Sequence, residues 1–331
     1  MVPSAVSTPL GPLAPLSRRF RRFGELECRN DSPVYFDLSL AVAEDEALLE
    51  LVSRLGTPQP NLFFAATRFL GAPYESAAAF RGFVLDHARE VLDLMRARRT
   101  QTNEVGRCAV LLPALAALPQ PLALLEVGAS AGLCLFPDRY AYEYRIGDAR
   151  HALGHGPVRL ATEARGALPV PRQLPAVVWR TGLDLAPIDV RNDAEVRWLE
   201  ACVWPDQTDR LARLRAAIGL ARGDPPVMVR GDAIADLLDV AASAPREATL
   251  VVFHSAVLSY LDAGERQRFA ATVRRSRAVW LANEGAGIVH PSPEPDPAEA
   301  SFLLTSGDTV LARSHPHGRW IEWMAGDWHP S

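Results

Sequence analysis

The chain has 331 residues, of which 48% are hydrophobic and 22% charged, and its formal net charge is −4 at pH 7. This composition is typical of a globular protein with a large core. It argues against a disordered chain and against a general nucleic-acid-binding role. Every basic side chain other than histidine is arginine. The absence of lysine excludes a Schiff-base lysine, a P-loop lysine and a Tyr-x-x-x-Lys dehydrogenase pair.

The remaining composition indicates a cytoplasmic protein. The four cysteines are far apart, so neither a zinc site nor a disulfide framework is predicted: they are Cys28, Cys108, Cys134 and Cys202. Residues 1–16 carry no charge and the first arginines follow them, whereas a secretory signal has its charges in front. We therefore expect a flexible start. Three prolines interrupt the apolar stretch from Cys108 to Leu125, which predicts a helix, a turn and a strand rather than a membrane span.

The periodicity changes near residue 118. From 17 to 118 apolar residues recur at three- and four-residue intervals, which predicts a helical region. From 119 to 331 short apolar runs alternate with helical segments, which predicts an α/β domain with a mostly parallel, Rossmann-like sheet. The predicted strands are Leu122–Val127, Ala176–Trp179, Pro226–Arg230, Thr249–His254 and Ala278–Asn283. The predicted helices between them are Ala194–Cys202, Asp209–Ala221, Ala233–Val240 and Gly264–Arg275.

Two segments depart from this alternation. We expect an insertion near residues 141–172, because Tyr140–Leu160 alternates like a strand and a hairpin. After the proline-rich loop His290–Pro297, the segments Ser301–Leu311 and Arg319–Met324 predict antiparallel strands.

The most informative motif lies in Leu124–Leu133 (LLEVGASAGL). An apolar run ends in an acid, and small residues follow at alternate positions: the four residues are Glu126, Gly128, Ser130 and Gly132. One interpretation is a nucleotide site, in which a tight turn opens a helix whose first N–H groups face the ligand. The same letters also form Gly-x-Ser-x-Gly, the nucleophile elbow of an α/β-hydrolase.

The place of the motif in the chain favours the nucleotide interpretation. A nucleophile elbow follows several strands, whereas this motif follows the first predicted strand, and no His-Gly-Gly oxyanion loop precedes it. A serine hydrolase with Ser130 as nucleophile, and His254 or a later histidine as base, remains an alternative. A non-catalytic binding module that keeps the nucleotide fold is a second alternative.

Polar residues also end the other predicted strands. Asp184 is expected to hold ribose hydroxyls, with Asp148 as a rival, and Asp232 is expected to meet an adenine. His254 is the catalytic candidate, as a general base, and a hydrogen-bonded core histidine is its alternative. Glu284 is interpreted as a solvated loop acid rather than a member of the same cleft. Acids at these ends favour a ligand with hydroxyls and a positive charge over a diphosphate.

A polar run precedes the first predicted strand and contains Gln101, Asn103, Glu104 and Arg107. It predicts a helix cap, a cover over the cofactor or substrate, or both. His315 and His317 have no acid or cysteine partner at a useful spacing, so no metal site is predicted.

These motifs resemble two groups of proteins. The arrangement looks like a class I S-adenosylmethionine-dependent methyltransferase, in which an acid lies two residues ahead of a Gly-x-Gly-x-Gly turn. Here Ser130 stands in place of the middle glycine. From about Phe20 to the C-terminus the chain resembles the bacterial family called domain of unknown function 2332. The matching segments are Thr100–Glu104 with Arg107, Glu126–Leu133, Asp138–Tyr140, Gly182–Asp184, Trp204–Asp206 and His254–Ser255.

The methyltransferase resemblance implies S-adenosylmethionine as cofactor and a small molecule as methyl acceptor. From the composition and the interrupted apolar stretch we expect no nucleic-acid or membrane partner. Glu126, Gly128, Ser130 and Gly132 would then form the cofactor turn. The family called domain of unknown function 2332 implies no particular activity.

Overall fold

The structure is a computed structural model that describes residues 11–56, 58–286, 288, 301–326 and 328. The first ten residues and the predicted loop His290–Pro297 lie outside the described residues. The chain divides into two compact units: one comprises the residues up to Thr102 together with Asp193–Leu211, and the other comprises Asn103–Asn192 and the residues from Ala212 onward. The first unit thus ends ahead of the change in periodicity near residue 118 and includes a helical segment from between two predicted strands.

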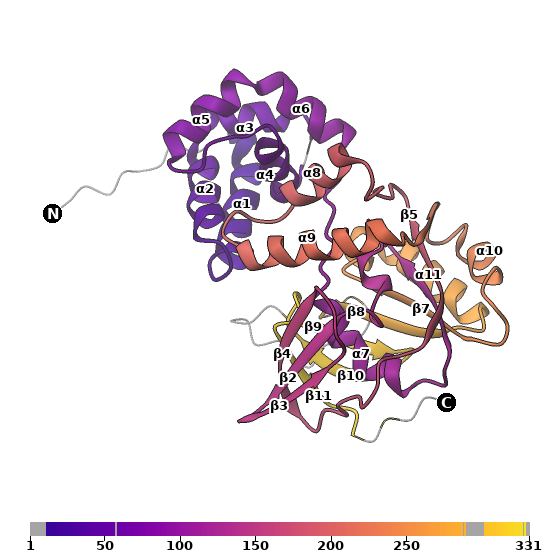
Figure 1. The fold of residues 1–331 in the computed structure, drawn as a ribbon. Helices are drawn as coiled ribbons and strands as arrows, with labels where there is room; N and C mark the ends of the chain where they lie inside the picture. The colour runs from indigo at the N-terminus through magenta and orange to yellow at the C-terminus, as the bar shows by residue number, and fades with distance from the viewer. Residues whose placement is uncertain (1–10, 57, 287, 289–300, 327, 329–331) are drawn as a thin grey trace. The chain divides into compact units, whose positions relative to one another are not determined.

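The first unit, here called the helical unit, is built from short helices (Figure 1). They are α1 (Ala14–Phe23), α2 (Pro33–Glu44), α3 (Glu46–Ser53), α4 (Pro60–Phe69), α5 (Ala77–Asp86), α6 (Ala88–Ala97), α8 (Asp193–Ala201) and the first turn of α9 (Thr208–Gly223). Ser32, Asp45 and Ser76 cap α2, α3 and α5, each side chain accepting a backbone N–H from the first turn. Aromatic rings fill the core, and the rings of Tyr35 and Phe64 stack with centroids 4.5 Å apart.

The second unit, here called the sheet unit, contains one sheet of eleven strands among the described residues (Figure 1). In chain order they are β1 (Leu122–Val127), β2 (Ala141–Ile146), β3 (Ala149–Leu153), β4 (Arg159–Gly166), β5 (Val177–Asp184), β6 (Val227–Arg230), β7 (Thr249–Ser255), β8 (Val279–Gly285), β9 (Phe302–Ser306), β10 (Thr309–Ser314) and β11 (Trp320–Trp323). Across the sheet their order is β3-β2-β4-β11-β10-β9-β8-β7-β1-β5-β6.

Five neighbouring parallel strands form the Rossmann-like part of this sheet. In the order β6-β5-β1-β7-β8 they follow the 3-2-1-4-5 sequence of a doubly wound fold. All six residues of β1 are buried, as expected for a central parallel strand. The predicted fold class is confirmed. Because the chain order reverses between β1 and β7, the carboxyl ends of these two strands are the place where such folds bind ligands.

The other end of the sheet departs from this pattern. Strands β8 to β11 pair antiparallel, which confirms the predicted C-terminal antiparallel strands. The hairpin expected in the insertion is formed by β2 and β3. However, β4 pairs parallel with β11, so this segment extends the main sheet. The local pattern of neither strand specifies so distant a pairing.

Helices cover the two faces of the Rossmann-like part. On one face, here called the α11 face, Leu125, Val127 and Val252 pack in one core cluster with α10 (Leu237–Ala242) and α11 (Ala263–Arg275). Side chains alternate along a strand, so Glu126 points to the other face. That face is here called the α7 face, after α7 (Arg107–Ala117), whose first residue acts electrostatically on Glu126.

The prediction of a helix directly after the glycine turn is wrong. Only a short 3-10 turn, Leu133–Leu135, follows β1 before the chain enters β2. Residues 133–136 are all apolar and buried, so they lack the polar face of a surface helix. Pro137 follows at once and disfavours helical geometry in the residue before it.

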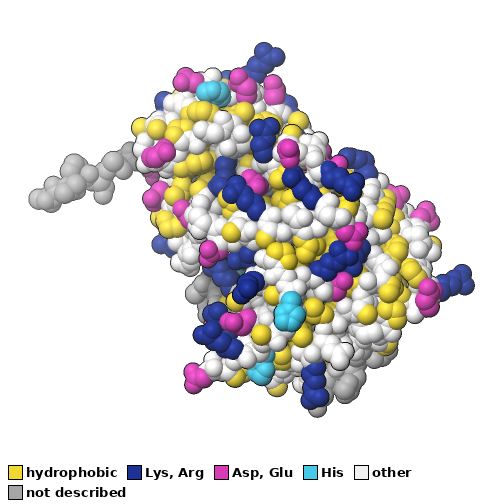
Figure 2. All heavy atoms as spheres, viewed as in Figure 1, with side chains coloured by type: hydrophobic (Ala, Val, Ile, Leu, Met, Phe, Trp, Pro, Cys, Tyr) yellow, Lys and Arg dark blue, Asp and Glu magenta, His cyan; other side chains and the backbone are white. Residues whose placement is uncertain are grey.

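Charge is mixed on the surface. On the face drawn in Figure 2, arginine and acidic side chains are interspersed, and no patch of one sign covers that face. No helix among the described residues is long and apolar enough to cross a membrane.

Candidate functional site

The glycine turn at the end of β1 has left-handed backbone geometry. Gly128, Ser130 and Gly132 have φ values of 68°, 54° and 68°. A Cβ added to Gly128 would lie 2.4 Å from Cγ2 of Val257, and one added to Gly132 would lie 2.9 Å from Sδ of Met228. The turn therefore needs glycine at these two positions for both conformation and space.

Asp184, at the end of β5, holds this turn. Its Oδ2 accepts the N–H of Ser130 at 2.8 Å, and its Oδ1 accepts the N–H of Ala186 at 2.8 Å. Both oxygens thus bind backbone of neighbouring loops. This geometry gives Asp184 a positioning role and does not support the predicted ribose contact. The rival, Asp148, lies in the turn between β2 and β3, at the opposite end of the strand order.

Asn103 braces the same turn from the other side. Its Nδ2 donates to the carbonyl of Ala129 and its Oδ1 accepts the N–H of Leu133, both at 2.9 Å. The N–H of Gly128 donates to the carbonyl of Leu183 at 2.8 Å. Several N–H groups of the turn are therefore used inside the protein, which differs from the expectation that they face a ligand.

The rest of the polar run forms the start of α7. Glu104 accepts the N–H of Gly106, the residue just before the helix, at 2.9 Å. Arg107 donates from Nε to the carbonyl of Pro316 at 2.9 Å and from Nη1 to that of Ser255 at 3.1 Å. Gln101 is buried and belongs to the helical unit. No side chain caps α7, whose N-cap residue is Gly106, so the predicted helix cap is wrong, and the predicted cover over a ligand stays a prediction.

Glu126 has the most unusual environment in this region. Its side chain is only 5% exposed, and its Oε2 is buried with no hydrogen bond to any described residue. Burial raises the pKa of Glu126 well above its ordinary value; Cys134 adds to the shift and the Arg107 guanidinium opposes it. A buried carboxyl without a partner is costly, so it favours a ligand that brings a hydrogen-bond donor or a positive charge.

Ser130 does not have the surroundings of a catalytic serine. Its Oγ is also buried without a hydrogen bond to the described residues. A serine nucleophile needs a base within hydrogen-bonding reach, usually a histidine. No histidine that the structure describes makes such a contact, so Ser130 shares the Gly-x-Ser-x-Gly sequence and the left-handed φ of a nucleophile elbow but not its base.

His254 lies on the α11 face and has both ring nitrogens in use. Trp280 donates its indole N–H to Nε2 at 2.9 Å, and Nδ1 lies 2.7 Å from Oε1 of Glu284. An indole can only donate, so Nε2 is the acceptor and Nδ1 carries the hydrogen. The ring is fully buried and meets Phe269 of α11 edge-on. This geometry favours the alternative interpretation, a hydrogen-bonded core histidine, over a general base.

Glu284, at the end of β8, is 1% exposed, so its interpretation as a solvated loop acid is wrong. Its Oε1 accepts the N–H groups of Val257 and Leu258 at 2.9 and 3.2 Å in addition to the histidine contact. Its Oε2 has no hydrogen bond to the described residues. Glu284 therefore fixes the loop that places Val257 over Gly128.

Asp232, at the end of β6, is exposed and caps a turn. Its Oδ1 accepts the N–H groups of Ile234 and Ala235 at 2.8 and 2.9 Å. This turn delays the helix, which begins at Leu237 rather than at the predicted Ala233. The contacts give Asp232 a local structural role and do not support the predicted adenine contact.

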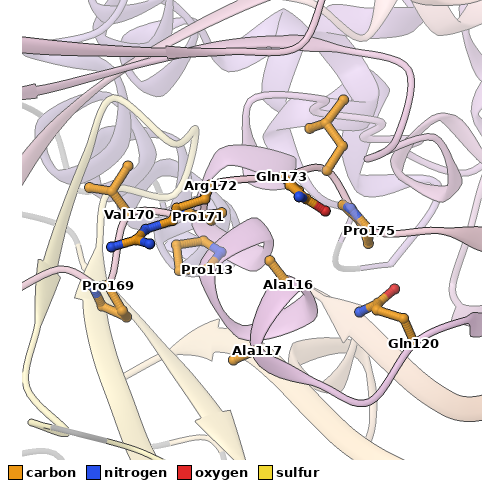
Figure 3. A pocket seen from close by; sticks show the side chains of 11 residues that line it. Pro113, Ala116, Ala117, Gln120, Pro169, Val170, Pro171, Arg172, Gln173 and Pro175 are labelled. Carbon is orange, nitrogen blue, oxygen red and sulfur yellow. The ribbon is translucent and has the colours of Figure 1, made fainter.

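A cavity of about 390 Å³ lies at the opposite, amino ends of the strands (Figure 3). Pro113 and Ala116 of α7 line it together with Gln120, which precedes β1, and the proline-rich segment Pro169–Pro175. Its walls are largely apolar, and none of the predicted site residues lines it. Within the described part of the chain, no three His, Cys, Asp or Glu side chains gather as a metal site requires.

Comparison with known proteins identifies a family. The profile of a family described as an uncharacterized protein conserved in bacteria (DUF2332) matches residues 17–323. The chain belongs to this family. No curated protein and no solved structure matches the chain.

The DUF2332 profile covers both units, and sequence analysis missed two polar roles within this region. Trp280 was predicted only as part of a strand, yet it supplies the donor that fixes His254. Arg180 of β5 forms a two-point ion pair with Asp138, both contacts at 3.0 Å, and so ties the segment after the glycine turn to the sheet. An arginine directly after the predicted strand Ala176–Trp179 is the signal that could have identified Arg180.

Proposed function

We propose that this member of DUF2332 is an S-adenosylmethionine-dependent methyltransferase acting on a small molecule. The observation that supports the proposal best is the buried carboxyl of Glu126, whose Oε2 has no hydrogen bond to the described residues. It lies at the carboxyl end of β1, beside a left-handed glycine turn and at the point where the strand order reverses.

The residues present fit this cofactor in their chemistry. S-adenosylmethionine carries a positively charged sulfonium and amino group together with ribose hydroxyls. Glu126 would hold a cationic group, and the Oγ of Ser130 would hydrogen-bond a neighbouring polar group. When bound, the cofactor supplies the methyl group that is transferred.

The chain's own residues contribute binding and orientation. Glu126 would favour its ionised form beside a bound cationic group, because the carboxylate pairs with a cation better than the acid does. Asp184 and Asn103 keep the turn rigid so that Glu126 and Ser130 stay aligned. The side chain of Val257 packs over Gly128, so we expect the loop after β7 to shift when a ligand contacts this glycine.

Isothermal titration calorimetry with S-adenosylmethionine tests the proposal. We expect micromolar binding by the wild type. Glu126→Gln, which keeps the shape but removes the charge, should weaken binding about 30-fold or more, and Ser130→Ala about fivefold. Absence of binding to the wild type, or equal binding by Glu126→Gln, would reject S-adenosylmethionine as the ligand held by Glu126.

A further inference from the structure

A second set of buried polar atoms without partners lies in the helical unit. The hydroxyl of Tyr35, the Nη1 of Arg68 and the Nε2 of Gln207 are buried and form no hydrogen bond with the described residues. Tyr35 is 1% exposed and Gln207 is 8% exposed. All three groups can donate a hydrogen bond, so together they need an acceptor.

These groups belong to one neighbourhood. Burial raises the pKa of Tyr35 well above its ordinary value and that of Tyr74 to about 12, and the charge of Arg68 opposes both shifts. The ring of Tyr35 also lies 5.9 Å from that of Trp204, whose carbonyl accepts the N–H of Gln207. The ring of Tyr35 also stacks on that of Phe64, one helical turn before Arg68 in α4, so α2, α4 and the α8–α9 connection meet around Tyr35.

Positive charge gathers in the same neighbourhood. Burial raises the pKa of Cys202 to about 11, and a backbone contact from Gln101 and the charges of Arg210, Arg98 and Arg68 oppose the shift. Arg210 also donates to Oε1 of Gln207 at 2.8 Å. Three guanidinium groups therefore act on the thiol of Cys202.

Two of these three guanidinium groups have no carboxylate partner among the described residues. Arg68 and Arg98 form no ion pair with any residue in the described ranges, although Arg98 lies 5.7 Å from the ring centroid of Trp198. The acid that precedes Gln207, Asp206, is exposed and instead accepts the hydroxyl of Ser32 and, at 3.3 Å, the N–H of Val34. A partly buried guanidinium with an unused N–H is unfavourable unless an anion pairs with it.

We propose that the helical unit holds an oxyanion-binding site centred on Arg68, with the Tyr35 hydroxyl and the Gln207 amide as neutral donors. Its ligand is a phosphate group, either free or carried by a small molecule. Arg68 supplies a charge-assisted hydrogen bond, and the rings of Phe64 and Trp204 next to Tyr35 keep the surroundings apolar. This site is independent of the function proposed for Glu126.

Calorimetric titration with inorganic phosphate and with methyl phosphate, at constant ionic strength, tests this site. We expect saturable binding, weakened about 30-fold by Arg68→Gln and about fivefold by Tyr35→Phe. Arg18→Gln is the matched control, because it removes the same charge from an exposed position of the helical unit. Tighter binding of methyl phosphate would indicate a phosphorylated small molecule, and equal binding would indicate the free oxyanion.

Three results would overturn the proposal. The first is absence of saturable phosphate binding to the wild type. The second is binding of chloride with the same affinity as phosphate. The third is equal phosphate affinity of Arg68→Gln and Arg18→Gln. Tyr35→Phe guards against misfolding of Arg68→Gln, because it removes only one oxygen. If Tyr35→Phe raises the melting temperature but leaves phosphate affinity unchanged, the hydroxyl serves no ligand and the assignment fails. Glu126→Gln should bind phosphate normally, so the two proposals fail separately.

Discussion

The two faces of the sheet at the β1–β7 boundary treat their ionisable side chains differently. On the α11 face, both nitrogens of His254 are hydrogen-bonded, and one oxygen of Glu284 accepts three N–H groups. On the α7 face, Glu126 is almost as buried, and its Oε2, like the Oε2 of Glu284, has no hydrogen bond to a described residue. The difference is that no N–H group among the described residues anchors the Glu126 carboxyl, whereas three anchor that of Glu284. A polar residue at a strand end is therefore not a site by itself. What matters is whether the fold already uses its hydrogen-bonding capacity.

Replacing His254 should give the largest loss of stability. His254→Leu removes the common partner of the Trp280 N–H and the Glu284 carboxyl, so we expect the free energy of unfolding to fall by about 3 kcal/mol. Urea denaturation measures this change, with the exposed His151→Leu as control. If His254 served only as a general base, the variant would lose activity and keep its stability. That result would contradict the structural role given to the α11 face.

Gly128→Ala tests the packing between the glycine turn and the loop after β7. Left-handed backbone and the contact with Val257 should together cost about 2–3 kcal/mol. Gly147→Ala is the matched control, because Gly147 has a φ of 56° and no atom within 4 Å of an added Cβ. It should cost only about 1 kcal/mol. Equal melting temperatures of the two variants would show that Val257 moves away freely.

Asp184→Ala should lower the free energy of unfolding by about 1–2 kcal/mol, because the N–H groups of Ser130 and Ala186 lose their acceptor. Asp184→Asn keeps one acceptor oxygen and should lose roughly half as much. Thermal unfolding distinguishes these values. A variant that is as stable as the wild type but does not bind S-adenosylmethionine would support the predicted ribose contact of Asp184 instead.

Glu126→Gln should have the smallest effect on folding, with the opposite sign. The raised pKa means that the folded state holds the proton more tightly than the unfolded state, so wild-type stability falls as pH rises from about 4.5 toward the folded pKa. Glu126→Gln cannot ionise at this position and so keeps its stability as pH rises. In urea denaturation series its free energy of unfolding should equal that of the wild type in acid and exceed it above neutrality. A wild type that gains stability over this range relative to the variant would contradict an unpartnered Glu126.

The sequence predicted much of the fold because its signals are local. The apolar run at β1 and the periodicity of α11 each lie within one element. The pairing of β4 with β11 was not predictable, since it joins residues 157 positions apart, such as Glu163 and Trp320, and depends on register. The helix expected after the glycine turn is absent, because the buried apolar run behind the turn and Pro137 disfavour a surface helix there.

The candidate site was predicted less completely, for a related reason. Small residues at Gly128 and Gly132 follow from backbone geometry, which a motif records. The hydrogen-bond partners of His254 and Asp184 lie on other strands and loops. Whether these two side chains are already hydrogen-bonded therefore depends on packing across the sheet. The opposite facing of Glu126 and His254 follows from strand register, which no single segment contains.

Proton release on ligand binding tests the central claim most directly. S-adenosylmethionine would be titrated calorimetrically into the wild type and Glu126→Gln in two buffers of different ionisation enthalpy. We predict that binding to the wild type releases protons, because a cationic group beside Glu126 lowers a pKa that burial raises, and that Glu126→Gln loses both binding and release. Binding without proton release, or undiminished binding by Glu126→Gln, would contradict the account.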